Sequence, residues 1–197
     1  TPNIGVTNGL NDSKIEDQWQ DIHELNEKYE NIEILKGVEV DILENGDLDL
    51  PDSVLAKADL VLVAIHSHFD MDKKEQTKRI IRALKNKYVN ILAHPSSRLI
   101  HKRKPIDFSL EKVLKIAKKH KIAVECDAQP DRLDLNDTQL RRAKKIGVKI
   151  AINTDAHSLK QLETMQYGIN QARRGWIEPQ NVINTYELSD LKEFLKK

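Results

Sequence analysis

Short apolar runs alternate with amphipathic segments along this chain, and that alternation constrains its fold more than any other feature. The clearest run is Leu60–Ile65, which has no polar residue and is therefore typical of a strand buried on both faces. The segments between such runs carry apolar residues at helical spacing. Strands and helices that alternate with short links predict a parallel sheet with right-handed crossovers and helices outside it.

The pattern gives approximate bounds for each strand and helix, and it marks several caps and turns. We expect strands at residues 32–43, 60–65, 89–93, 122–126 and 148–152, and helices at residues 13–29, 72–86, 137–146 and 188–195. Two further helices are expected to begin at Asp107 and Ser158, which we interpret as N-caps, as we do Asp72. Asn45-Gly46 predicts a turn, and Gly147 predicts the end of a helix.

Composition indicates one domain with a sizeable core, because the 197 residues are 39% hydrophobic and 32% charged and contain no low-complexity linker. The net charge of +1 does not by itself indicate a nucleic-acid-binding protein. No apolar run is long enough to span a membrane, so we expect no membrane partner. The single cysteine, Cys126, allows no disulfide within the chain and fits a reducing compartment, so we expect a cytoplasmic location.

Histidines and carboxylates follow several predicted strands directly. His66 follows residues 60–65, His94 follows residues 89–93, and Asp155 and His157 follow residues 148–152. In a parallel barrel the carboxyl ends of the strands open on one face, where the chemistry lies. Each histidine taken alone is more readily explained as structural, but repeated ligand types at the same end of successive strands predict one polynuclear metal site.

A carboxylate inside the first predicted strand is another candidate ligand. Glu39 lies among apolar residues, and burying it is costly unless it is paired or binds a cation. Asp41 and His68 are weaker candidates in the same regions. Glu125, Asp127 and Asn153 are expected to orient histidines rather than bind metal.

Mixed histidine and carboxylate ligands suit Zn²⁺, Mn²⁺ or Fe, and clusters of such metals activate water and stabilise phosphoryl displacement. Arg98 and Arg132 follow two of the predicted strand ends and could hold phosphate oxygens, although ordinary salt bridges are the alternative. Of two basic clusters, residues 101–104 are as readily substrate-binding as solvated. Residues 141–145 favour a solvated helix face.

The chain resembles the PHP (polymerase and histidinol phosphatase) domain, in particular the one at the C-terminal end of bacterial and archaeal family X DNA polymerases. The resemblance covers nearly the whole chain. It rests on the strings at residues 37–42 (GVEVDI), 64–67 (AIHS), 93–95 (AHP) with Arg98-Leu99, 130–135 (PDRLDL) and 154–158 (TDAHS). Residues 172–177 (ARRGWI) and 181–185 (NVINT) are similar to the polymerase subgroup.

This resemblance implies a distorted (β/α)₇ TIM-like barrel with a trinuclear centre of Mn²⁺ or Zn²⁺. It places Glu39, His66, His94, Asp155 and His157 at ligand positions. Of these, we expect His94 and Asp155 to matter most for catalysis, and Arg98 and Arg132 to bind substrate. The implied activity is metal-dependent 3′–5′ exonuclease and 3′-end processing, so the implied partners are DNA 3′ ends and a polymerase core.

The sequence departs from the family pattern in two places. The first motif, a His-x-His with a following Thr-Asp-His, is absent, and residues 8–10 (Asn-Gly-Leu) resemble the stretch after it. We therefore expect residues 1–197 to be a PHP domain that is incomplete at its N-terminus, lacks the first barrel strands and has impaired activity. Residues 125–130 (ECDAQP) also differ from the usual pattern.

Two alternative functions stay open at this stage. One is a small-molecule phosphatase of the histidinol-phosphate type, against which the polymerase-like residues 172–177 argue. The other is an inactive scaffold that contacts the polymerase core. An open barrel would leave unpaired strand edges, and such edges favour a homodimer.

Overall fold

The structure is a computed structural model that describes residues 12–196, with the side chains of residues 12 and 13 left undescribed. The resemblance at residues 8–10 lies outside the described part. Five parallel strands form one sheet in the order β1-β2-β3-β4-β5. Their bounds are β1 Gly37–Asp41, β2 Leu60–Ala64, β3 Ile91–Leu92, β4 Ala123–Asp127 and β5 Ile150–Asn153. The predicted parallel α/β fold is confirmed.

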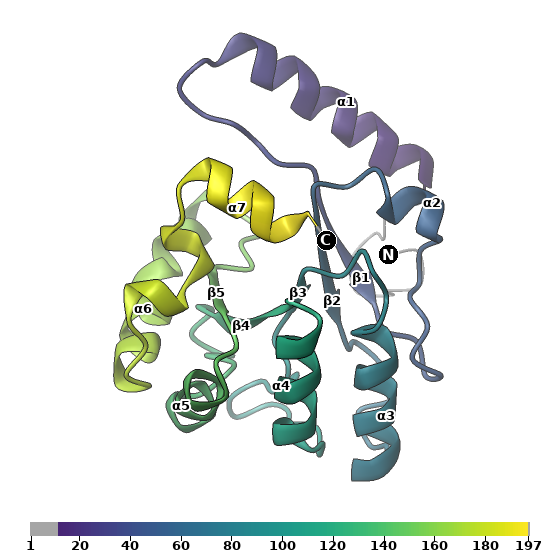
Figure 1. The fold of residues 1–197 in the computed structure, drawn as a ribbon, viewed down its shortest axis with the longest axis vertical. Helices are drawn as coiled ribbons and strands as arrows, with labels where there is room; N and C mark the ends of the chain where they lie inside the picture. The colour runs from purple at the N-terminus through teal and green to yellow at the C-terminus, as the bar shows by residue number, and fades with distance from the viewer. Residues whose placement is uncertain (1–11, 197) are drawn as a thin grey trace.

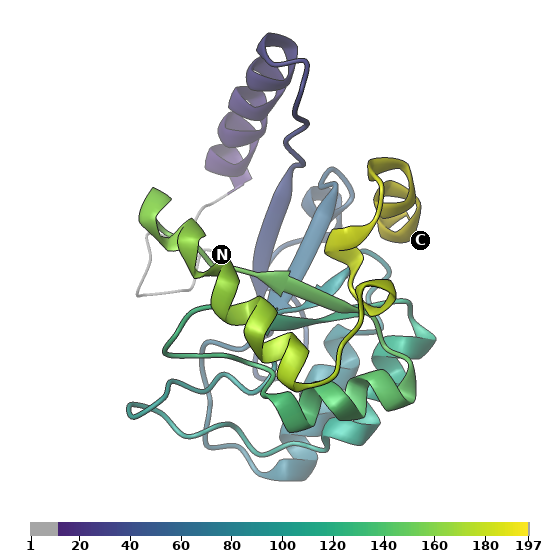
Figure 2. The ribbon, with the colours of Figure 1, turned by 90° about the vertical axis from the view of Figure 1, so that its left-hand side faces the viewer.

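Helices follow the strands as the sequence pattern predicts. Their bounds are α1 Asp12–Lys28, α2 Asp52–Leu55, α3 Lys73–Ala83, α4 Leu110–Lys119, α5 Asp137–Ile146, α6 Met165–Arg174 and α7 Leu188–Leu195. Three short 3₁₀ helices lie at η1 Leu159–Thr164, η2 Pro179–Asn181 and η3 Ile183–Thr185. Helices α3, α4 and α5 lie side by side, whereas α1 and α7 lie toward the end of the sheet where β1 and β2 begin (Figure 1). Figure 2 shows α1 projecting from the rest of the molecule.

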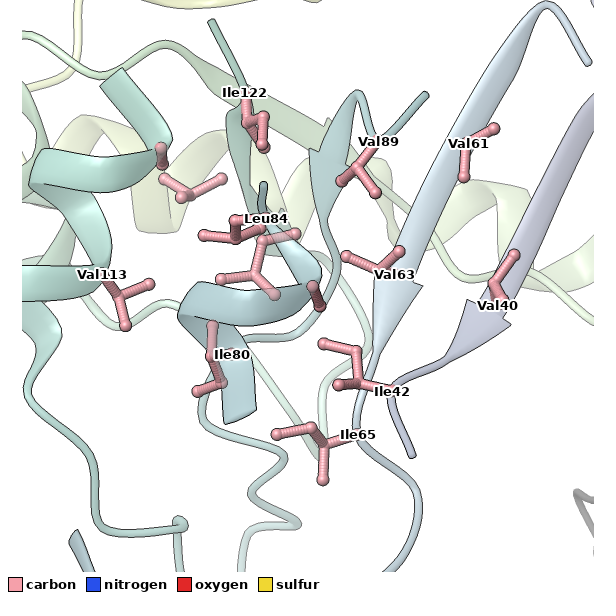
Figure 3. Packing of buried hydrophobic residues seen from close by; sticks show 14 of the residues in the cluster. Val40, Ile42, Val61, Val63, Ile65, Ile80, Leu84, Val89, Val113 and Ile122 are labelled. Atoms are coloured by element: carbon pink, nitrogen blue, oxygen red, sulfur yellow. The ribbon is translucent and has the colours of Figure 1, made fainter. Parts of the chain in front are cut away.

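The two faces of the sheet differ in chemistry. One face carries Val40, Val61 and Val63, which pack with Ile80 and Leu84 of the α3 region in the main hydrophobic core (Figure 3). The opposite face carries a smaller apolar cluster that includes Ile91, Ala123 and Ala151. Side chains alternate along a strand, and Glu39 is in register with Leu62 and then Ile91, so Glu39 belongs to this second face.

Most of the predicted element ends are confirmed. Asp72 caps α3 by accepting the backbone N–H groups of Lys74 and Glu75, and Gly147 ends α5 with φ of 86°. The prediction that Asp107 caps a helix is wrong. Helix α4 begins at Leu110, with Ser109 at the N-cap position, and the Asp107 carboxylate instead forms a 3.2 Å ion pair with Lys73.

Three other expectations need correction. Ser158 precedes the 3₁₀ helix η1 and makes no capping hydrogen bond with its side chain. The first strand, predicted at residues 32–43, spans only Gly37–Asp41. The third strand is shorter than predicted, because ladder pairing is limited to Ile91 and Leu92. The chain after Ala93 forms the turn that contains His94, in which the Ser97 N–H donates to the His94 carbonyl at 2.8 Å.

The buried guanidinium of Arg79 joins the exits of β1 and β2. Arg79 is 2% exposed on helix α3. It donates to the carbonyl of Leu43 at 2.8 Å, to that of Ser67 at 2.9 Å and to that of Ile42. Gly46 allows this approach, because at φ of 86° a Cβ on residue 46 would lie 2.7 Å from the Arg79 carbonyl oxygen. One side chain thus ties the chain after β1 to the loop after β2, which carries the candidate ligand His66.

We predict that Arg79→Met will lower the free energy of unfolding by about 3 kcal/mol or more, because several buried carbonyls lose their charged donor. Urea unfolding followed by circular dichroism measures the change. Arg82→Met is the matched control, and it should cost at most about 1 kcal/mol. Arg82 is exposed, and among the residues that the structure describes its ion-pair partner is Asp47. Equal losses in the two variants would contradict this role for Arg79.

Candidate metal centre

Glu39, His66 and His94 converge on one point beside the second face of the sheet. The Glu39 Oε1 atom lies 3.0 Å from His94 Nε2 and 3.6 Å from His66 Nε2. The two imidazole rings meet edge to face with centroids 5.1 Å apart. Among the residues that the structure describes, these three form the group whose ligand atoms all lie within 4.8 Å of one another. Three of the five predicted ligands are therefore brought together.

Asp41 fixes His66 at the exit of β2. The Asp41 Oδ1 atom accepts the backbone N–H of His66 at 3.0 Å and lies 3.4 Å from its Nδ1 atom. Asp41 is buried on β1, two residues after Glu39, and therefore on the same face of the strand. The sequence placed Asp41 only among the weaker ligand candidates, and its contacts are those of an orienting residue. His68 is half exposed and lies 4.0 Å from Glu44, outside the cluster.

His94 is held in a strained turn by buried carboxylates. Its φ of 25° lies in the left-handed region, which residues other than glycine rarely occupy. The backbone N–H of His94 donates to Glu125 Oε2 at 2.5 Å, and Asn153 donates to Glu125 Oε1 at 2.7 Å. Asp134 accepts the backbone N–H of Ser96 at 2.8 Å. Glu125 and Asn153 thus orient a histidine as predicted, but through its main chain.

The contact between Glu39 and His94 shifts the pKa of both side chains. Burial raises the pKa of Glu39, but the hydrogen bond to His94 and the charges of His94 and His66 outweigh it and lower that pKa to about 2. Burial lowers the pKa of His94, but the hydrogen bond and charge of Glu39 outweigh it and raise that pKa to about 9. At neutral pH the metal-free site therefore holds a carboxylate–imidazolium pair.

Arg132, which lines the same cavity, pairs with two further carboxylates. Arg132 Nε lies 3.3 Å from Asp127 Oδ2 and 3.7 Å from Asp155 Oδ2. Burial raises the pKa of Asp127 to about 7, against the lowering by the hydrogen bond from the Gln129 backbone N–H. Asp155 has φ of 45°, so a second predicted ligand also occupies the left-handed region.

The remaining predicted ligand, His157, is not packed into the cluster. Its side chain is 63% exposed, and its Nδ1 atom lies 2.8 Å from the Asp155 carbonyl oxygen. Both Asp155 and His157 nevertheless line the cavity of about 1140 Å³ that Glu39, His66 and His94 also line. The five predicted ligands therefore share one cavity, divided into a tight group of three and a looser pair.

The two arginines predicted to bind substrate lie in different environments. Arg132 lines the cavity. Arg98 is not among the described residues lining it, and its guanidinium donates to the carbonyls of Arg132 at 2.6 Å and Leu133 at 2.5 Å. Arg98 thus holds the loop that carries Arg132. Within the basic cluster at residues 101–104, Arg103 lines the cavity and stacks 4.0 Å above the Phe69 ring.

Sequence patterns did not predict two residues of the site, Gln129 and Asp134. Gln129 donates to the carbonyls of Thr154 and, at 3.3 Å, of Asp155, and so ties the exits of β4 and β5 together. Asp134 is fully buried and supports the turn after His94. A carboxylate between leucines at residues 133–135 was the available signal for Asp134, by the argument that singled out Glu39. Gln129 carries no such signal.

The donors in this cluster fit a transition-metal ion. A carboxylate oxygen and two imidazole nitrogens are ligands that Zn²⁺ and Mn²⁺ accept. The Nε2 atoms of His66 and His94 both face Glu39 Oε1, at 3.6 and 3.0 Å, so the three donors could be shared by one ion.

We predict that metal binding at pH 7 will release about one proton per protein, because an ion must displace the proton that His94 holds through its raised pKa. Apparent affinity should then fall about tenfold per pH unit as the pH decreases below about 9. Calorimetric titration with Zn²⁺ in two buffers of different ionisation enthalpy measures the proton count. His94→Ala should abolish the release, whereas no release from the wild-type protein would contradict the assignment.

Comparisons with known proteins agree with this geometry. No protein-family model matches the sequence. The Bacillus subtilis DNA polymerase/3′-5′ exonuclease PolX is 43% identical over 194 residues, which cover 98% of this chain and 34% of that enzyme. A protein named as a probable phosphatase from Thermoanaerobacter sp. strain X514 is 36% identical over 183 residues, covering 88% of this chain and 72% of that protein. The chain thus spans about a third of the polymerase.

Two solved structures share the fold. The histidinol phosphate phosphatase of Lactococcus lactis, complexed with zinc, L-histidinol and phosphate, has a TM-score of 0.60 at 15% identity over 86% of this chain and 76% of that one. A chain in archaeal ribonuclease P with mature tRNA has a TM-score of 0.56 at 19% identity, covering 91% and 76%. The chain belongs to the PHP family of phosphoesterases.

None of the helices in residues 12–196 combines the length and the apolar character that crossing a membrane requires.

Proposed function

We propose that this chain is the metal-dependent phosphoesterase domain of a family X DNA polymerase and that it hydrolyses phosphodiester bonds at DNA 3′ ends. The observation that carries the proposal is one cavity that is lined both by ligand donors and by an arginine. Glu39, His66 and His94 supply the donors, and Arg132 supplies the cation. The 43% identity to a DNA polymerase/3′-5′ exonuclease over nearly the whole chain supports the DNA substrate.

In this proposal Glu39, His66 and His94 would hold one ion, and Asp155 and His157, which line the same cavity, would contribute to a further ion. Such ions, Mn²⁺ or Zn²⁺, would supply Lewis acidity toward phosphate and lower the pKa of water. Asp41 and Glu125 keep the two histidines aimed into the cavity. Asp155, 3.7 Å from Arg132, links the ligand group to the substrate group.

Arg132 is the residue we assign to the substrate phosphate. Its Nη1 atom is buried and has no hydrogen-bond partner among the described residues, so a donor remains for an incoming oxygen. Guanidinium groups bind phosphate oxygens in a fixed fork geometry. Arg98 acts on substrate indirectly in this proposal, because its donors are used by the carbonyls of Arg132 and Leu133.

The same proposal extends to the architecture. We propose that the five-stranded sheet is part of a distorted (β/α)₇ barrel of the PHP type, a view supported by the two structures of TM-score 0.60 and 0.56. The polymerase core would then be a partner in a longer polypeptide, which fits the 34% of PolX that the chain covers.

A small-molecule phosphatase is the second candidate. The chain covers 72% of a protein named as a probable phosphatase, more than twice the share that it covers of the polymerase. The cavity of about 1140 Å³ accepts either a phosphomonoester or a strand end.

We predict that Mn²⁺-dependent removal of nucleotides from a 3′-recessed DNA duplex will fall at least about 100-fold in His94→Ala and in Asp155→Ala, because each variant loses a group that organises transition-state charge. The assay should use the longest natural polypeptide that contains this chain. His23→Ala is the matched control, since His23 is exposed on α1 and its ion-pair partner among the described residues is the exposed Glu27. Undiminished activity in the two variants would overturn the proposal.

The same preparation separates the two candidates. Faster turnover of L-histidinol phosphate than of the DNA duplex, at equal enzyme and metal concentration, would favour the small-molecule phosphatase. Absence of both activities together with retained metal binding would favour a scaffold role.

A further inference from the structure

The end of helix α6 presents an exposed tryptophan against the basic side of helix α5. We name this the α5 surface and define it by Arg141, Arg142, Lys145, Arg174 and Trp176. We propose that the α5 surface binds a single-stranded segment of nucleic acid outside the catalytic cavity. This inference rests on the proposed function, because it extends the contact with a polynucleotide substrate beyond its reacting end.

Trp176 occupies a position in the backbone that ordinarily requires glycine. Its N–H donates to the Arg173 carbonyl at 2.9 Å, and the next N–H, of Ile177, donates to the Ala172 carbonyl at 3.0 Å. These are the two bonds of a Schellman motif, whose left-handed C′ position is usually filled by glycine. Here that position has φ of 59° and carries the largest side chain available.

Core packing does not explain the tryptophan. Its side chain is 64% exposed, so burial offsets little of the cost of the left-handed conformation. The preceding residue, Gly175, is needed for another reason, because a Cβ there would lie 2.8 Å from the Leu140 Cβ. Strained residues that gain little from packing point to function. The backbone at residue 176 is held in place, since Lys144 Nζ donates to the Trp176 carbonyl at 2.6 Å.

The charges around the indole are mainly positive. Residues 137–149 and 173–176 contain seven lysines and arginines and one acidic residue, Asp137, in a chain whose net charge is only +1. Arg174 pairs with Asp137 at 3.2 Å and Lys144 pairs with Glu178 at 2.8 Å. Arg142 and Lys145 are exposed and form no ion pair with any acidic residue that the structure describes. They remain available for an external polyanion.

The combination of groups selects a single strand. The Arg141 guanidinium lies 4.1 Å above the indole ring, so an aromatic face and a cation are already joined. Unpaired bases stack on aromatic side chains while basic residues follow the phosphates. In a duplex the base faces are covered by neighbouring bases, so this pairing of an exposed indole with cations favours a single strand.

The α5 surface is within reach of a strand that ends in the cavity. Helix α5 begins five residues after Arg132, which lines the cavity, and Arg141 is one helical turn further on. Five extended residues and one turn span on the order of 20–25 Å at most. With about 3.4 Å between bases along a strand, a few nucleotides bridge that distance.

The test is a fluorescence-anisotropy titration of an end-labelled oligo-dT of about 12 nucleotides with the metal-free chain in EDTA. We expect saturable binding that weakens about 20-fold between 50 and 200 mM salt, as three phosphate contacts require. Trp176→Gly should weaken binding about 5- to 100-fold without lowering the thermal midpoint, because glycine suits the C′ position. Arg141→Ala/Arg142→Ala should weaken binding and reduce the salt dependence.

The matched control is Lys78→Ala/Lys85→Ala, which removes two exposed positive charges from the region of helix α3. It should leave binding within about twofold of the wild type, since these charges lie outside the α5 surface. The inference is overturned if the wild-type chain shows no saturable binding at 50 mM salt, if Trp176→Gly binds as the wild type does, or if the control loses as much as Arg141→Ala/Arg142→Ala. Because the titration contains no metal, its failure leaves the hydrolase proposal intact, and an inactive metal centre leaves the titration interpretable.

Discussion

The rest of this structure depends on one constraint: the backbone N–H and C=O groups just beyond the ends of the parallel strands need hydrogen-bond partners. The ladder stops at the edge of the sheet where the site lies, and buried polar side chains replace it. Arg79 satisfies carbonyls after β1 and β2, Glu125 satisfies the N–H of His94 after β3, and Gln129 satisfies carbonyls after β5. Since an unpaired buried backbone group is costly, these contacts fix the loops firmly. The candidate ligands His66, His94 and Asp155 are carried by those loops, whereas Glu39 lies within β1.

The electrostatics of the site follow from the same arrangement. The carboxyl groups that accept backbone N–H groups here are buried. Burial raises the pKa of Glu125 to about 8 and that of Asp127 to about 7. Glu39 behaves differently because two histidines face it, and its pKa falls to about 2. These carboxyl groups therefore differ in pKa according to what each one contacts. The candidate ligand Glu39 is ionised, whereas the supporting Glu125 and Asp127 have a raised pKa.

The sequence predicted the sheet and the tight cluster because both depend on local patterns. Uninterrupted apolar runs mark buried strands, and His66 and His94 follow such runs directly. The separation of Asp155 and His157 from the cluster could not be predicted, since it depends on the turn after β5 and on the contact between Asp155 and Arg132. The role of Arg98 was equally inaccessible, because its carbonyl partners at residues 132 and 133 are remote in sequence. Asp107 was mistaken for a cap because a carboxylate near a helix start has the same local signature as one that pairs across helices.

The central claim is that Glu39, His66 and His94 bind one metal ion together. The most direct measurement is anomalous X-ray diffraction at the zinc edge from crystals of the zinc-loaded protein. The account predicts an anomalous peak about 2.0–2.2 Å from Glu39 Oε1 and from one ring nitrogen of each histidine. A peak that lacks any of these three ligands, or a cavity without anomalous signal at saturating zinc, would contradict it.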